Sequence, residues 1–126
     1  MVVQVYCFGN PLLKDDRLPF ELLPQLRKEF GTINFIEASS PDDIEGKREV
    51  NIIDMAKGIP KVTLITDVDA ICSNKTCSLH DFDLGMTLKL MKKMGNTNKV
   101  RIFAVPQGYK KGKALAELKK LIKKEL

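Results

Sequence analysis

The chain has 126 residues, of which 44% are hydrophobic and 29% charged, and its net charge is +5. This length suits one domain with its own core, so we expect a single domain over residues 1–126. No apolar run approaches the roughly eighteen residues that a membrane helix needs, and no leader pattern begins the sequence. We therefore expect a cytoplasmic protein with no membrane partner.

The first part of the sequence alternates strand and helix patterns. The run VVQVYCF is typical of a buried strand, and a helix is predicted over residues 19–30, where Pro19 suits the first turn and Pro24 favours a kink. TINFIEA predicts a second strand, SSPDDIEGKRE a loop or one helical turn, and EVNIIDMA a third strand.

The next strand changes direction. KVTLITDVDAI predicts a fourth strand, joined to the third by so few residues that no crossover helix fits between them. Because parallel neighbours need such a crossover, these two strands do not form a parallel unit.

The last part of the sequence contains two predicted helices around one strand. SLHDFDLGMTLKLMKKMG has helical period over residues 78–95, and its capping pair, Ser78 and Asp81, places His80 in the first turn. KVRIFAVP predicts the fifth strand, and an amphipathic lysine-rich helix closes the chain. This order predicts an α/β three-layer sandwich: a five-stranded, mostly parallel sheet with one antiparallel strand and helices on both faces.

Charge and cysteine content exclude two common classes of protein. The lysines concentrate on one face of the last helix, as on a solvated surface, and no nucleic-acid motif accompanies them, so we expect no nucleic-acid partner. Three cysteines argue against a disulfide framework. Cys7 fits a small hydrophobe in a strand, while Cys72 and Cys77 lack the paired spacing typical of zinc sites.

Polar residues occur where predicted strands end. Asp15 and Asp16 follow the first strand, Asp54 ends the third, and His80 begins the helix that leads to the fifth. Because ligands of open α/β sheets bind outside the carboxyl ends of the strands, we expect Asp16, Asp54 and His80 to meet on one solvent-open rim. Two carboxylates and an imidazole suit nickel, zinc or iron. Taken singly, each also fits a structural role, in capping a helix or holding a backbone N–H.

Three motifs give a family resemblance. GNPLLKDD at 9–16, NIIDMAKGI at 51–59 and SLHDFDLG at 78–85 resemble, in the same order, segments of the nickel–iron hydrogenase maturation endopeptidases. These enzymes remove a C-terminal tail from the precursor of the hydrogenase large subunit. Arg17 and Pro19 stand where the family commonly has glycine.

The resemblance implies a hydrolase whose catalytic and metal-contacting residues are Asp16, Asp54 and His80, with Asp15 orienting the loop. It implies no permanent cofactor: nickel would be supplied by the substrate, the precursor of the hydrogenase large subunit, and would align the scissile peptide. We expect a monomer. Whether an aspartate is a general base or only a ligand stays open. Two other functions also stay open: a non-catalytic metal- or small-molecule-binding module on this scaffold, and a basic interaction protein that uses its last helix.

Overall fold

The computed structural model describes residues 3–8, 17–38, 49–56, 58–66 and 99–126. Its elements, in chain order, are β1 (Val3–Cys7), α1 (Leu18–Glu29), β2 (Ile33–Glu37), β3 (Glu49–Ala56), β4 (Thr63–Ile65), β5 (Lys99–Pro106) and α4 (Lys111–Glu125). The third and fifth predicted strands match β3 and β5 at both ends, and the first helix begins one residue earlier than predicted. The predicted helix over 78–95 lies outside the described residues.

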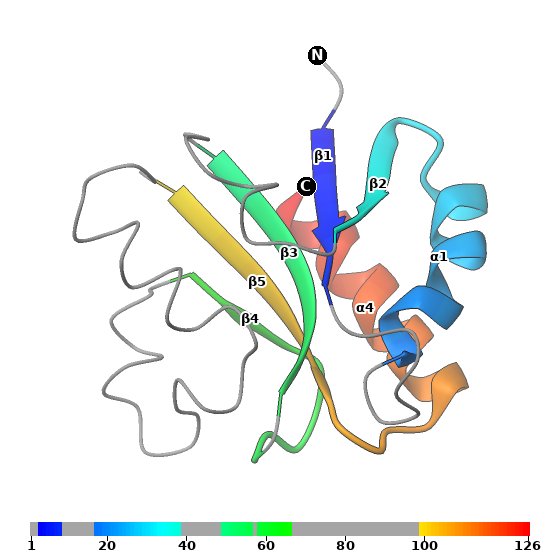
Figure 1. Ribbon diagram of the computed structural model, residues 1–126, viewed down its shortest axis with the longest axis vertical. Helices are drawn as coiled ribbons and strands as arrows, with labels where there is room; N and C mark the ends of the chain where they lie inside the picture. Colours follow the sequence, from blue (N-terminus) through cyan, green and yellow to red (C-terminus); the bar gives the residue numbers. More distant parts are fainter. Residues whose placement is uncertain (1–2, 9–16, 39–48, 57, 67–98) are drawn as a thin grey trace.

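The five strands form one sheet in the order β2-β1-β3-β5-β4 (Figure 1). β1 pairs in parallel with β2 and β3, and β3 pairs in parallel with β5. β4 is antiparallel to β5, as the short connection after β3 requires, because a parallel return needs a crossover. The predicted α/β fold, with a mostly parallel sheet and one antiparallel strand, is confirmed.

Both described helices pack on the same face of the sheet (Figure 1). Glu29 near the end of α1 pairs with Lys119 and Lys123 of α4, at N–O distances of 3.9 and 3.3 Å. Among the described helices, none is both long and apolar enough to cross a membrane. The core on this face combines strand and helix residues: Val5, Cys7, Leu22, Leu23, Leu26, Phe35, Ile53, Met55, Val62, Phe103, Val105, Ala114, Leu118 and Ile122.

The opposite face of the sheet is also apolar and buried. Because successive strand residues point to opposite faces, each central strand contributes to both cores. The two-sided burial explains why most residues of β3 and β5 are apolar on both faces, with only Asn51 and Asp54 in β3 and Arg101 in β5 as polar positions after the first residue. The core on this second face contains Tyr6, Phe8, Ala38, Val50, Ile52, Ala56, Val100, Ile102 and Ala104.

Helix α1 is stabilised mainly by the apolar side chains that it buries, because its sequence contains two prolines, one of them in the helix interior. Pro19 lies in the first turn, as predicted, and the helix continues through Pro24 for 12 residues. Pro24 has no N–H to donate to the preceding turn, which weakens the helix locally. Three fully buried leucines on its inner face, Leu22, Leu23 and Leu26, offset this loss.

Candidate functional site

Two polar side chains are buried in the described part of the chain. Asn51 is 4% exposed and Asp54 is 2% exposed. Both lie on β3, three positions apart, so strand alternation places them on opposite faces. Burying a polar group costs free energy unless hydrogen bonds or a function offset it, so each residue needs its own explanation.

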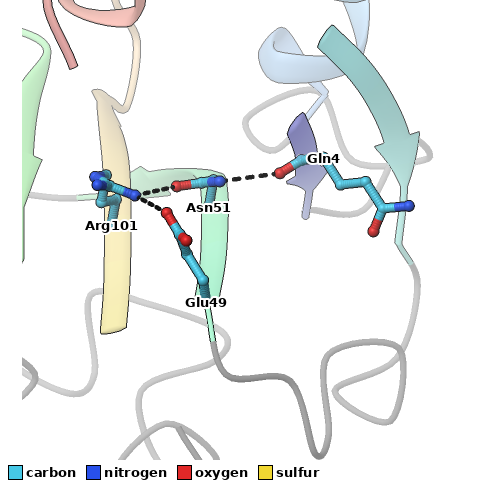
Figure 2. A network of polar contacts seen from close by, with 4 residues as sticks. All are labelled: Gln4, Glu49, Asn51 and Arg101. Carbon is cyan, nitrogen blue, oxygen red and sulfur yellow. Dashed lines mark hydrogen bonds and ion pairs between the residues drawn. The ribbon is translucent and has the colours of Figure 1, made fainter. Parts of the chain in front are cut away.

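Asn51 belongs to a hydrogen-bond network that joins three strands (Figure 2). Its Nδ2 donates to the Gln4 carbonyl of β1 at 3.1 Å, and its Oδ1 accepts from an Arg101 guanidinium nitrogen of β5 at 3.2 Å. Arg101 also forms an ion pair with Glu49, and this hydrogen bond lowers the pKa of the Glu49 carboxyl. The network lies toward the amino ends of the strands and ties them together, which is a structural role.

Asp54 lies at the other end of β3. It is the third residue from the strand end, opposite Ala104 of β5, and its Oδ1 accepts the Met55 N–H at 2.8 Å. The expectation of a solvent-open side chain is wrong for this residue, because it is 2% exposed. Two strand residues follow it, and its neighbours on this face, Ile52 and Ala56, are core residues. β3 lies between β1 and β5, so a residue at this position of the strand is buried.

The order of the strands gives Asp54 a special place. From β1 the chain moves to β2 on one side and then to β3 on the other, so the direction of winding reverses between β1 and β3. Phe8 N–H donates to the Ile53 carbonyl at 2.9 Å, which brings the end of β1 beside Asp54. In open α/β sheets, ligands bind at this reversal, outside the carboxyl ends of the strands.

The remaining predicted site residues, Asp16 and His80, lie outside the described residues, as does Asp15. The structure therefore places one of the three and leaves their convergence a prediction. At the start of α1 the N-cap residue is Arg17, which makes no capping hydrogen bond through its side chain and pairs with Glu21 at 3.1 Å. Within the described ranges, no group of three His, Cys, Asp or Glu side chains is placed to hold a metal ion.

A cavity of about 290 Å³ opens at the same end of the sheet, on the side of the helices. Gly108, in a left-handed conformation with φ of 79°, forms the turn that leads from β5 to α4 along this cavity. The amino ends of both helices face it, so its walls are positively polarised. Sequence patterns gave no sign of this cavity, because its walls come from distant segments: Arg17, Leu18, Glu21, Met55, Gly108, Tyr109 and Lys111.

Cys7 is not a nucleophile in this arrangement. Its side chain is fully buried, and burial, followed by the nearby charges of Asp54 and Glu37, raises the pKa of its thiol well above the usual range. A thiol that stays protonated is a poor nucleophile and a poor metal ligand. The interpretation of Cys7 as a small hydrophobic residue is confirmed.

Comparisons with known proteins show similarity in structure rather than in sequence. No protein-family model matches the chain, and no curated protein matches its sequence. The fold is similar to that of a solved structure described as the solution structure of an endopeptidase from Escherichia coli, with a TM-score of 0.62. The match covers 98% of this chain and 89% of that chain at 15% sequence identity. At this identity, the similarity shows that the two proteins share a fold.

Proposed function

We propose that this protein is an endopeptidase that removes the C-terminal tail of the nickel-loaded precursor of a nickel–iron hydrogenase large subunit. The observation that carries the proposal is Asp54: a buried carboxylate near the carboxyl end of β3, at the reversal point between β1 and β3. Its place in the fold is where α/β proteins bind ligands, and its residue type suits a metal ion.

The surroundings of Asp54 hold its carboxylate in a defined position before substrate binds. The Met55 N–H fixes one oxygen, so the group is oriented in advance. The apolar residues around it lower the local dielectric, which strengthens attraction to an incoming positive ion.

The positions of the described residues that flank the segments of Asp16 and His80 are compatible with both side chains lying near Asp54. Residues 9–16 connect Phe8, beside Asp54, with the start of α1 at the same end of the sheet. The position of His80 at this end of the sheet is supported by comparing the length of its predicted helix with the length of β5. The sequence predicts a helix that ends near Gly95, four residues before β5 begins at Lys99. From His80 to Gly95 such a helix would be about 24 Å long, close to the roughly 26 Å of an eight-residue strand such as β5.

In the proposed reaction, Asp16, Asp54 and His80 contact the nickel that the substrate carries. Their contact aligns the scissile peptide at the rim, where a water oxygen bonds to the carbonyl carbon and the carbon–nitrogen bond breaks. The leaving nitrogen takes the proton that this water gives up and departs with the tail as an amine. Two further observations support this proposal: the three motifs resemble those of this peptidase family, and the fold is shared with a protein described as an endopeptidase.

The test is incubation of the purified protein with a nickel-loaded precursor, followed by mass analysis of the precursor's C-terminus. We expect tail removal by the native chain and none by Asp54→Asn, which keeps the shape of the side chain and removes its charge. Glu37→Gln is the matched control, because Glu37 is an exposed acid at the carboxyl end of β2. It should cleave like the native protein.

Two results would contradict the proposal. The first is an intact tail after incubation of the folded native chain with nickel-loaded precursor. The second is full cleavage by Asp54→Asn, which would remove Asp54 from the reaction. If the protein alone instead retains one nickel or zinc ion after dialysis and cleaves nothing, the function is that of a metal-binding module.

A further inference from the structure

A second surface lies away from Asp54, between β4 and the outer side of α4. A groove of about 390 Å³ separates the two elements. β4 is the last strand in the sheet order, and its three residues are half-exposed. Leu64 from β4 and Leu121 from α4 are partly buried against the core and give the groove an apolar floor.

The four lysines in the second half of α4 fall into two groups. Lys119 and Lys123 face α1, where both pair with Glu29. Lys120 and Lys124 face the groove, and neither has a carboxylate at ion-pair distance among the described residues.

The groove also contains a lysine that precedes β4 and one acid. Lys61, just before β4, is exposed and likewise has no carboxylate at ion-pair distance within the described ranges. The acid, Glu117, is already engaged, since its carboxylate accepts the Val62 N–H at 3.1 Å and the Tyr109 hydroxyl at 2.7 Å. The groove therefore has an apolar floor, a strand edge, and three positive lysines against one negative carboxylate, so its net charge is positive.

We propose that this groove docks an extended, acidic segment of a partner protein, which adds to β4 as a further strand. Edge strands accept extended peptides through main-chain hydrogen bonds, and side chains at alternate positions give specificity. An apolar side chain would cover Leu64 and Leu121, and acids two positions before and after it would reach the lysines, since residues on one strand face recur about every 7 Å.

The usual role of lysine on an edge strand is to prevent pairing between copies of the protein. That role explains Lys61 alone. It does not explain why Lys120 and Lys124, on a helix, face the same groove across an apolar floor. The same lysines repel a basic strand and attract an acidic one, so they would select an acidic partner.

The probe is a fluorescent peptide of sequence Glu-Thr-Glu-Thr-Leu-Thr-Glu-Thr-Glu, capped at both ends, titrated with the full chain and followed by anisotropy. We expect saturable binding, and no binding of the counterpart in which lysine replaces glutamate. Lys120→Gln/Lys124→Gln should weaken binding about tenfold, as expected for the loss of two partly desolvated charge contacts. The matched control, Lys119→Gln/Lys123→Gln, makes the same charge change on the same helix and should weaken binding less than about threefold.

Amide hydrogen exchange provides the second measurement. With peptide bound, exchange of the amides in Thr63–Ile65 should slow if the peptide pairs with β4. Equal weakening by both double variants would mean attraction to the whole basic helix and would overturn the proposal. Unchanged exchange in β4, or the absence of saturable binding, would overturn it as well.

Discussion

Replacement of Asn51 by alanine measures what the network of Figure 2 contributes to stability. The substitution removes the hydrogen bond to the Gln4 carbonyl and the one from Arg101. A neutral hydrogen bond contributes about 1 kcal/mol and one with a charged donor about 1.5–3 kcal/mol. We therefore expect the free energy of unfolding to fall by roughly 2–4 kcal/mol, because Asn51 is buried and water replaces its side chain poorly.

The assay is urea unfolding followed by far-ultraviolet circular dichroism. The midpoint of Asn51→Ala should fall with an unchanged slope, since the amount of surface exposed on unfolding stays the same. Arg101→Met supplies the second arm of a double-mutant cycle, because it removes one of the two hydrogen bonds and leaves the bond to Gln4 in place. The two substitutions should be non-additive by about 1 kcal/mol or more.

A fall of less than about 0.5 kcal/mol for Asn51→Ala would refute this reasoning, because it is the size expected for an ordinary surface substitution. Additive losses in the cycle would show that Asn51 and Arg101 act independently. Neither residue is part of the proposed cleavage, so variants that remain folded should still remove the tail.

Three further outcomes test other parts of the structure. Leu118→Ala should lower the free energy of unfolding by about 2–5 kcal/mol, and Leu121→Ala by less, because Leu118 is fully buried and Leu121 only partly; urea unfolding measures both. The hydrogen bond from Tyr109 holds the pKa of the Glu117 carboxyl below its usual value, so this carboxylate stabilises the fold above that usual pKa and loses its effect as the pH falls through the lowered pKa. The stability difference between the native chain and Glu117→Gln should therefore shrink between about pH 6 and about pH 3, and a pH-independent difference would contradict it. Cys7 should resist alkylation in the folded chain and react in urea, as read by peptide mass mapping; labelling under native conditions would show that its site opens.

The sequence was sufficient to predict the elements that are buried on both faces. β3 and β5 are mostly apolar, each with a charged residue at its start, and both ends of each were predicted correctly. The reversed direction of β4 followed from a connection too short for a crossover. The predicted fourth strand continued to residue 71, whereas β4 ends at Ile65, and residues 67–71 lie outside the described part.

The order of the strands and the depth of Asp54 could not be read from the sequence. Strand order depends on contacts between distant segments, and the reversal point between β1 and β3 becomes visible only with that order. A polar residue near a strand end has the same pattern whether it is exposed or buried. The Asn51–Arg101 contact was missed for a related reason: both residues look like ordinary polar positions until the register pairs them side by side.

The position of β5 in the sheet has a consequence for how the chain is made. β5 lies between β3 and β4, although it is the last strand to be synthesised. Until it arrives, one edge of the apolar strand β3 has no neighbour, and β4 has nothing to pair with among the described strands. At about 5–20 residues per second, the ribosome needs roughly 2–9 seconds to pass from Ala56 to Lys99. During that interval the nascent chain presents an open apolar edge, which is the kind of surface that chaperones recognise and that aggregates form around.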